Sequence, residues 1–412
     1  MITRFLYFLR ILGPGILFAS TAIGVSHLVQ STRAGAQFGF ALVAFVLMAN
    51  IFKYPFFEFG SRYASATGES LIKGYKREGN WILFIYFLIT LASMFTVVAA
   101  VSFVCSGLVV ELFDIQFNIN KVSLFLFIVC VSILISGKYN VLESLVKIIA
   151  VVLLFSTLVA LCFALIKGPV TQHSSFIAPI IWESKSILFI IALMGWMPTA
   201  VDLSTWNSIW TVERISSSIR KPNLKETLLD FNIGYIITII LSICFITLGA
   251  YLMYGSTDTL PDSSPAFASK LVSLYTQTLG DWSYWIIAVA AFSVMFSTTL
   301  AVFDGYARSM QQTFQLLFNF KHSYSMYFLW LIITAVGGYM IISLYMHNFK
   351  QLIDLATTIS FLIAPFCAIL NHRVIHASHV PANYRPPSWL RFLSYLGILY
   401  LIFFSVIFLV FV

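Results

Sequence analysis

The chain has 412 residues, of which 60% are hydrophobic and only 10% are charged. A soluble domain carries roughly a quarter charged residues, so this composition excludes a water-exposed globule and indicates an integral membrane protein. The net charge of +8 is explained by lysine and arginine in short loops, and it calls for no nucleic-acid partner.

About eleven apolar stretches are long enough to span a lipid bilayer as helices. No polar linker divides them, so we expect one transmembrane domain covering residues 1–412. In chain order the predicted spans are Ile11–Gln30, Phe38–Glu58, Trp81–Leu112, Val122–Ile135, Val141–Leu165, Ser186–Ile209, Ile233–Tyr254, Trp282–Phe303, Tyr327–Leu344, Leu352–Leu370 and Trp389–Val412.

The distribution of basic residues predicts the orientation of the chain in the membrane. Cytoplasmic loops carry an excess of lysine and arginine. An N-terminus in the cytoplasm, with Arg4 and Arg10, places most later basic loops on that side as well. The outside loop after the seventh span carries Asp258 and Asp262. We therefore predict a multi-pass plasma (inner) membrane protein with a cytoplasmic N-terminus and, from the odd number of spans, an outside C-terminus.

Two predicted spans contain residues that interrupt helices near the middle of the membrane. Gly24 and Ser26 weaken the first span, and Pro198 removes a backbone donor from the sixth. Irregular backbone at this depth is tolerated where it is buried in protein or lines a cavity. Breaks in the first and sixth spans favour two inverted repeats of five helices, about 11–165 and 186–376, with an extra helix at 389–412. The alternative is two ordinary kinks.

Several short motifs occur along the chain in the order that is typical of one transporter family. They begin with Gly13-Pro14-Gly15 and end in the tenth span. With these motifs the chain resembles the Nramp family of divalent metal–proton symporters. The further matches are Arg33 to Ala36, Arg62, Thr67, Gly68, Leu71, Met197-Pro198, Ser297, Thr299, Leu300 and Pro365-Phe366.

The resemblance implies the all-α LeuT-type fold, with broken helices 1 and 6, and the transport of a divalent metal ion such as Mn²⁺ or Fe²⁺ coupled to protons. The departures concern the ligands. The family's Asp-Pro-Gly-Asn in helix 1 aligns with Gly24 to His27, and its helix 6 histidine aligns with Thr199. Met197 matches the family's metal-contacting methionine. The acidic residues of the family's proton path align with Val97 and Ala100.

These residues define a candidate binding site at the two breaks, made of Gly24, Ser26, His27, Met197 and Thr199. His27 and Met197 are the candidate metal ligands, and a soft ion suits them better than Mn²⁺ or Mg²⁺. His27 and Asp202 are candidate coupling residues, because ionisable groups inside the membrane are costly and commonly functional. The alternative for each is structural: a hydrogen-bonded neutral imidazole for the histidine, and a cap or ion pair for the aspartate.

Other charged residues have a structural interpretation. Glu58 and Arg62 are four residues apart, as are Asp304 and Arg308, so each pair is expected to form an ion pair on one helix. Three histidines before the last span are expected to lie in a solvated cytoplasmic loop rather than to bind a metal: His372, His376 and His379.

The leading functional prediction is a secondary transporter of the Nramp type. The first alternative is a proton- or sodium-coupled transporter of a small organic or anionic solute, since the candidate site lacks the family's acidic ligands. The second is a sensor that binds without transporting. The sequence contains no Walker loop, dinucleotide fingerprint or nucleophile elbow, so we expect neither an enzyme nor a cofactor. The expected partners are the cargo, the coupling ion and the bilayer, and we expect a monomer.

Overall fold

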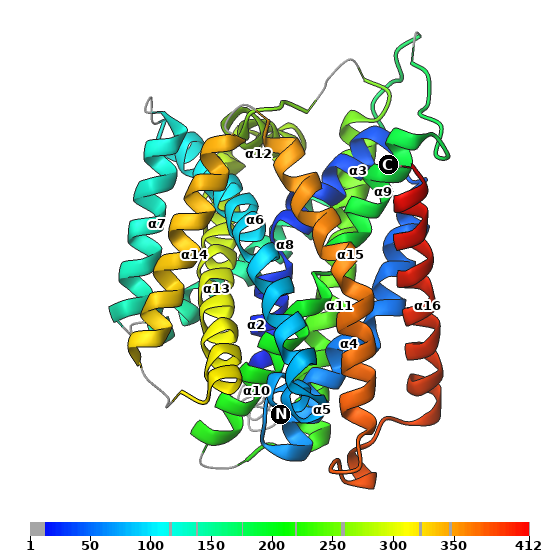
Figure 1. Cartoon of the computed structure of the whole chain (residues 1–412). Coiled ribbons are helices and arrows are strands. Elements are labelled where there is room, and N and C mark those ends of the chain that lie inside the picture. Colours follow the sequence, from blue (N-terminus) through cyan, green and yellow to red (C-terminus); the bar gives the residue numbers. More distant parts are fainter. Residues whose placement is uncertain are drawn as a thin grey trace, which may run out of the picture.

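The computed structural model describes the backbone of residues 13–114, 118–136, 139–174, 176–218, 221–256, 260–320, 324–345 and 348–411, and most of the side chains in these ranges. The secondary structure within these ranges is helical throughout, and the helices stand side by side as a bundle (Figure 1). This confirms the predicted all-α class.

The elements of the first half of the chain are α2 (Pro14–Ala22), η1 (Ser26–Ser31), α3 (Thr32–Phe38), α4 (Val43–Thr67), α5 (Leu71–Glu78), α6 (Asn80–Phe113), α7 (Ile119–Ser136) and α8 (Tyr139–Lys167). Those of the second half are α9 (Ser184–Gly195), η2 (Val201–Leu203), α10 (Ser204–Ser217), α11 (Leu224–Met253), α12 (Ser264–Leu279), η3 (Asp281–Ser283), α13 (Tyr284–Phe318), α14 (Tyr324–Leu344), α15 (Phe349–His376), η4 (Ala382–Tyr384) and α16 (Ser388–Phe411).

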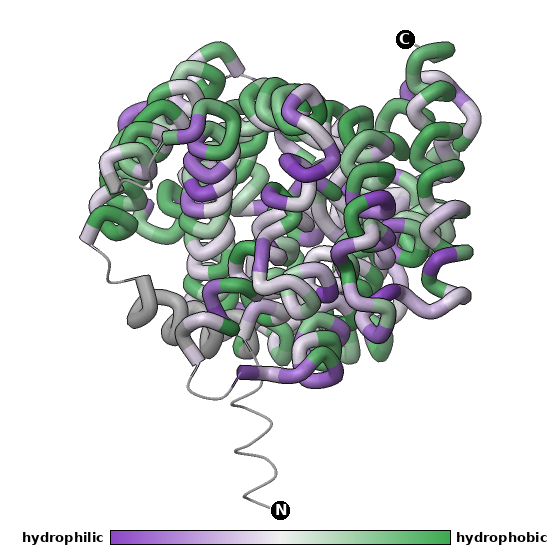
Figure 2. Tube along the Cα trace, turned by 60° about the horizontal axis from the view of Figure 1, so that its bottom comes forward, coloured by the Kyte–Doolittle hydropathy of each residue, from purple (hydrophilic) through white to green (hydrophobic). Residues whose placement is uncertain are grey.

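Many helices expose apolar side chains, as expected of a protein whose solvent is lipid. Within the described residues, eight helices are long and apolar enough to cross a membrane. The two broken segments and α8 correspond to the other three predicted spans, and the total of eleven stays a prediction. The last helix, next to the C mark in Figure 2, is mostly hydrophobic, and its exposed residues include Phe392, Leu399 and Phe403. These side chains suit contact with acyl chains.

The first membrane segment is interrupted, as predicted, after α2. Residues 23 and 24 leave the helix, and the chain then continues as the π-helical turn η1 and the short helix α3. Gly24 fits here because a Cβ at this position would lie 2.8 Å from Cγ2 of Thr298 on α13. The irregular backbone is fully buried in protein, where such a segment is tolerated at membrane depth. We call residues 23–25 the first break.

The second interruption lies between α9 and η2, and it also matches the sequence prediction. The helix ends at Gly195, and residues 196–200 are non-helical before the chain re-enters a helix through η2 and α10. The peptide bond between Met197 and Pro198 is cis. We call residues 196–200 the second break.

The first segment packs closely against α11 over its whole length. The Asp230 carboxylate accepts the backbone N–H groups of Gly13 at 2.9 Å and of Gly15 at 2.8 Å, which satisfies donors at the start of α2. Near this point the backbones touch, because a Cβ on Gly234 would lie 2.0 Å from the Gly15 carbonyl oxygen. Small residues at such crossings allow membrane helices to approach closely.

Basic residues that the sequence predicts to face the cytoplasm include Lys73, Lys76 and Arg77 of α5 and Arg214 of α10. These two helices lie at the end of the bundle where α2 begins (Figure 1). Here Arg373 pairs with Glu78 at 2.9 Å and Arg308 with Glu213 at 3.1 Å, which joins elements far apart in sequence. The helix α16 ends at the opposite face of the bundle. An odd number of crossings therefore fits the fold.

Two helices lie where the sequence analysis expected only loops. The amphipathic helices α5 and α12 are short and polar in part, and they form because their apolar sides pack on α6. The helix α15 also extends through His376, beyond its predicted end. His372 and His376 are therefore half-buried on a helix, with His372 bonded through Nδ1 to Ser394 Oγ at 2.8 Å, so the prediction of a solvated loop for these two was wrong.

Candidate functional site

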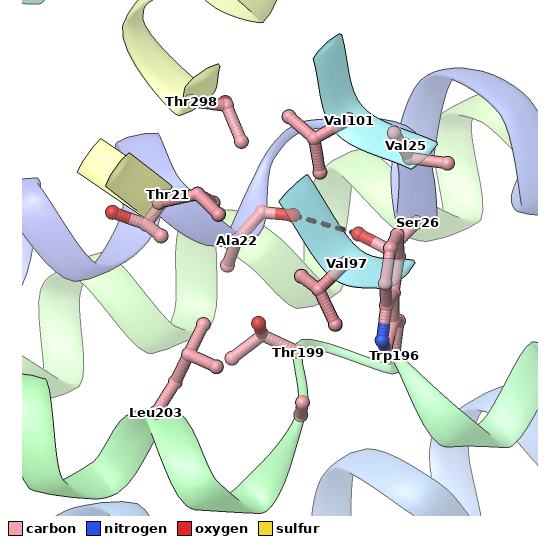
Figure 3. Close-up of a pocket in the computed structure, with 12 residues that line it drawn as sticks. Thr21, Ala22, Val25, Ser26, Val97, Val101, Trp196, Thr199, Leu203 and Thr298 are labelled. Atoms are coloured by element: carbon pink, nitrogen blue, oxygen red, sulfur yellow. Dashed lines mark hydrogen bonds between the residues drawn. The ribbon is translucent and has the colours of Figure 1, made fainter. Parts of the chain in front are cut away.

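A narrow cavity lies between the two breaks, and it is the natural candidate for a binding site. Figure 3 shows side chains from both breaks, from α6 and from α13 around one space. The cavity volume is about 20 Å³, which is room for about one water molecule, so a larger cargo requires the two breaks to move apart. The lining consists of Thr21, Ala22, Val25, Ser26, Val97, Val101, Trp196, Thr199, Ala200, Leu203, Thr298 and Val302.

Four hydroxyl groups supply the polar side chains of the cavity. Ser26 Oγ lies 2.6 Å from the Ala22 carbonyl, Thr21 donates to the Leu17 carbonyl at 2.8 Å, and Thr298 donates to the Ser20 carbonyl at 2.9 Å. The Thr199 hydroxyl points into the space from the second break (Figure 3). A hydroxyl that donates to its own helix still accepts through its lone pairs, so these groups suit a cargo that donates hydrogen bonds.

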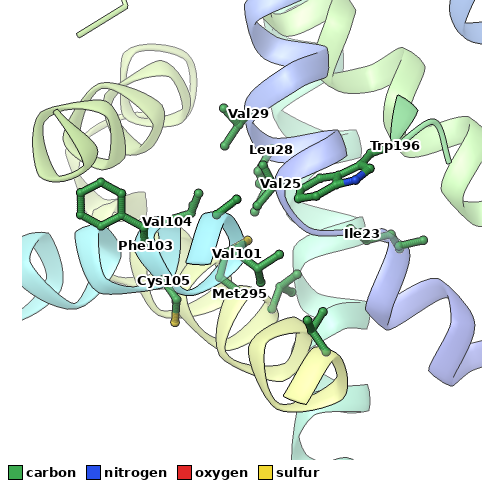
Figure 4. Packing of buried hydrophobic residues seen from close by; sticks show 14 of the residues in the cluster. Ile23, Val25, Leu28, Val29, Val101, Phe103, Val104, Cys105, Trp196 and Met295 are labelled. Atoms are coloured by element: carbon green, nitrogen blue, oxygen red, sulfur yellow. The ribbon is translucent and has the colours of Figure 1, made fainter. Parts of the chain in front are cut away.

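The cavity has no charged lining in the described part of the chain. Val97 and Val101 of α6 form one wall, and the position aligned with an acidic residue of the Nramp proton path is thus an apolar surface. Among the described residues, no three histidine, cysteine, aspartate or glutamate side chains are grouped so that they could hold a metal ion. Around the cavity the breaks are enclosed by apolar packing that includes Ile23, Leu28 and Trp196 (Figure 4).

The first break does not direct His27 into the cavity. The ring is completely buried, and its Nε2 lies 2.9 Å from the Thr238 carbonyl oxygen on α11. Because a carbonyl only accepts, Nε2 must carry the proton. In the neutral ring Nδ1 then keeps a lone pair, and the Ser26 Oγ lies 2.7 Å from it. The single Ser26 proton goes either to Nδ1 or to the Ala22 carbonyl at 2.6 Å. The ring is fully buried and is not part of the cavity lining, so its lone pair does not face the cargo space.

Met197 is likewise buried away from the cavity. Its side chain is fully inaccessible and belongs to an apolar cluster that includes Val201 and Phe361. The structure thus brings Ser26 and Thr199 together around one space, while Gly24, His27 and Met197 are not among its lining residues. A metal-binding role for His27 and Met197 stays a prediction that this geometry does not favour.

Asp202 lies just beyond the second break, in η2. It is 4% exposed, and its Oδ1 atom has no hydrogen-bond partner among the described residues. Lys53 is a cation whose charge acts on this carboxylate. A buried carboxylate with an unused oxygen next to the two breaks is suited to exchange a proton, which keeps Asp202 as a candidate coupling residue.

The sequence analysis missed Lys53, which is the most unusual buried residue near the breaks. It comes from the middle of α4, it is 0% exposed, and its Nζ donates to three backbone carbonyls. The distances are 2.7 Å to Met194, 2.8 Å to Gly195 and 3.3 Å to Thr199. A lysine inside the apolar stretch Phe38–Glu58 was the available signal, because intramembrane charges are candidates for function by default.

Comparison with known protein families gives a match over nearly the whole chain. Residues 15–411 match the family model described as natural resistance-associated macrophage protein-like (Nramp). An uncharacterized protein of Pasteurella multocida is 34% identical over 400 residues, which cover 96% of this chain and 91% of that protein. A divalent metal cation transporter, MntH, of Latilactobacillus sakei is 24% identical over 259 residues, 60% of this chain and 56% of that one.

Solved structures of transporters share the fold at low sequence identity. A manganese transporter of Eremococcus coleocola, solved as a mutant, superposes with a TM-score of 0.71 at 14% identity and covers 96% of this chain and 85% of that one. Mhp1, a nucleobase-cation-symport-1 family transporter, gives a TM-score of 0.61 at 15% identity and covers 96% and 91%. The fold is thus of the LeuT type, and the chain belongs to the Nramp-like family of multi-pass membrane transporters.

Proposed function

We propose that this protein is a secondary active transporter that moves a small solute through the cavity between the two breaks. The observation that carries this proposal is the convergence of both interrupted segments on one cavity lined by Ser26 and Thr199. Family membership supports it. In inverted-repeat transporters the cargo binds near the midplane where discontinuous helices meet, and the two halves then move around the fixed site.

The geometry favours a small organic or anionic solute as the cargo. A divalent cation that leaves water needs negatively charged or strongly donating ligands. Here the described cavity lining is apolar except for hydroxyls and backbone, and neither His27 nor Met197 is part of it.

Divalent metal transport is the second candidate. It is favoured by the family match and by the names of two relatives, both divalent metal cation transporters, at 24% identity. The coupling ion under either candidate is a proton or sodium. We propose Asp202 as the residue that binds it, because its carboxylate is buried and retains an unused oxygen.

Uptake into proteoliposomes tests the proposal. The purified protein is reconstituted, a proton or sodium gradient is imposed, and uptake of Mn²⁺, Fe²⁺ and a panel of small carboxylates, amino acids and nucleobases is measured. We expect accumulation of an organic solute, and its apparent affinity should fall about tenfold in Thr199→Val, since one lost hydrogen bond to the cargo costs about 1.4 kcal/mol.

The matched control is Ser343→Ala, which removes an exposed hydroxyl of α14 outside the cavity. This variant should transport like the parent protein. Uptake of metal ions alone would favour the second candidate, whereas binding of a solute with no flux under any gradient would favour a sensor and contradict transport.

A further inference from the structure

The second break ends with a cluster of carbonyl oxygens that point at a single position. The last four carbonyls of a helix lack their regular helical amide partners, and they carry the negative end of the helix dipole. In α9 the Met194 carbonyl accepts the Met197 N–H at 3.3 Å and keeps a second lone pair. The carbonyls of Met194 and Gly195 at the end of α9, together with that of Thr199 in the break, surround one atom, the Lys53 Nζ. Such a cluster is a natural site for a cation.

The ammonium group satisfies this cluster completely. It has three N–H donors and no acceptor, and the three carbonyls at 2.7, 2.8 and 3.3 Å provide one acceptor for each. Its own charge is completely buried inside the membrane bundle, a situation that is costly without compensation. The charge and the carbonyl cluster therefore stabilise each other, and Asp202 is the acidic group near them.

We propose that Lys53 is a built-in cation for the second break. Its ammonium occupies the position at the carboxyl end of α9 that a free metal or alkali cation would otherwise fill, so that the broken helix keeps its shape with no ion bound there. A metal ion held by the same three carbonyls would first have to displace the lysine.

This inference concerns the stability of the break and is independent of the cargo, so its test needs no transport assay. The thermal unfolding midpoint, Tm, of the full chain is measured in lipid nanodiscs for the parent protein and for Lys53→Ala, Lys53→Met and Lys53→Arg. We expect a Tm lower by several degrees in the alanine and methionine variants, because the carbonyls lose their donor. Lys53→Arg should stay above Lys53→Met, because it keeps a charge and N–H donors.

Chemical rescue separates a cation site from ordinary packing. Propylammonium chloride fits the space that Lys53→Ala leaves and supplies the missing donors, so it should raise the Tm of that variant. Tetramethylammonium chloride at equal concentration has the same charge but no N–H group, and it should not. The parent protein and Lys53→Met, where the side chain fills the space, should respond to neither salt.

The matched control is Lys185→Met. It removes an exposed lysine at the start of α9, the helix whose last carbonyls bind Lys53, and it should leave Tm unchanged. A Tm of Lys53→Met equal to that of the parent protein would overturn the proposal, as would equal rescue by the two salts. If the alanine variant cannot be purified, the order of the arginine and methionine variants decides the question, and a lower Tm for arginine contradicts the built-in cation.

Discussion

At the scale of single residues, charges near the breaks are held by partners from distant parts of the chain. Lys53 is held by α9 and the second break, and Arg33 of α3 forms two hydrogen bonds with Asp354 of α15, at 2.7 and 3.0 Å. Asp202 differs from Asp354, because Asp202 Oδ1 has no partner among the described residues whereas both Asp354 oxygens accept from Arg33. This unused carboxylate oxygen is the reason that Asp202 is the one proposed to exchange an ion.

Replacing Asp202 by asparagine should uncouple transport without abolishing binding. The amide keeps the shape of the carboxylate but cannot bind and release a proton, so the initial rate of gradient-driven uptake should fall about tenfold or more, which corresponds to about 1.4 kcal/mol in the coupled step. Exchange of labelled for unlabelled cargo without a gradient should persist. Asp281→Asn, an exposed change in η3, is the control, and equal losses in both assays would contradict a coupling role.

At the scale of elements, the first membrane segment depends on its close contact with α11. The Gly15 and Gly234 backbones approach so closely that a methyl group has no space. The Asp230 carboxylate from the same helix holds the amide groups at the start of α2. The position of the first break, and with it the place of Ser26 in the cavity lining, therefore depends on the contact with α11.

Gly234→Ala should lower the stability of the protein. The added Cβ would lie 2.0 Å from the Gly15 carbonyl oxygen, so the two segments must separate. Overpacking of this kind costs about 1–3 kcal/mol, and the Tm in nanodiscs should fall accordingly. Val336→Ala, on an exposed part of α14, should change stability by less than about 0.5 kcal/mol. A variant as stable as the parent protein would show that this contact is not tight.

At the scale of the whole molecule, α2 and α16 run in the same direction through the bundle, and α2 begins at the end where α5 and α10 lie (Figure 1). The helices α5 and α10 carry Lys73, Lys76, Arg77 and Arg214, so we call this end the basic end. The basic end is predicted to face the cytoplasm. The salt bridges Arg373–Glu78 and Arg77–Glu69 lie at this basic end. They pair two of its acidic residues with arginines.

Reporter fusions in bacteria test this orientation. Alkaline phosphatase fused after the C-terminus should be active, because the enzyme needs the oxidising side of the membrane. Green fluorescent protein, which fluoresces when it folds in the cytoplasm, should give no signal at the C-terminus and a strong signal at the N-terminus. The reverse pattern at the C-terminus would mean an even number of spans or an inverted chain.

The sequence by itself determined that lipid surrounds the protein, that the fold is all-α, and that the first and sixth membrane segments are interrupted. These depend on local or additive properties: the apolar length of each span, the basic loops, and helix-breaking residues such as Gly24 and Pro198. The ion pairs Glu58–Arg62 and Asp304–Arg308 were also predictable, and the structure confirms them at 2.5 and 2.7 Å, because residues four apart on a helix are neighbours wherever that helix packs.

Only the tertiary structure decided which groups meet at the breaks. His27 was predicted to face a cargo, but α11 brings the Thr238 carbonyl to its ring from 211 positions away. The sequence shows Lys53 as a charge inside an apolar span but does not name its partners. The first of these is the Met194 carbonyl at the end of α9, 141 positions along the chain. Such partners are fixed by how helices cross, and no local pattern specifies a crossing, so the polarity of the cavity depends on packing that only the folded chain displays.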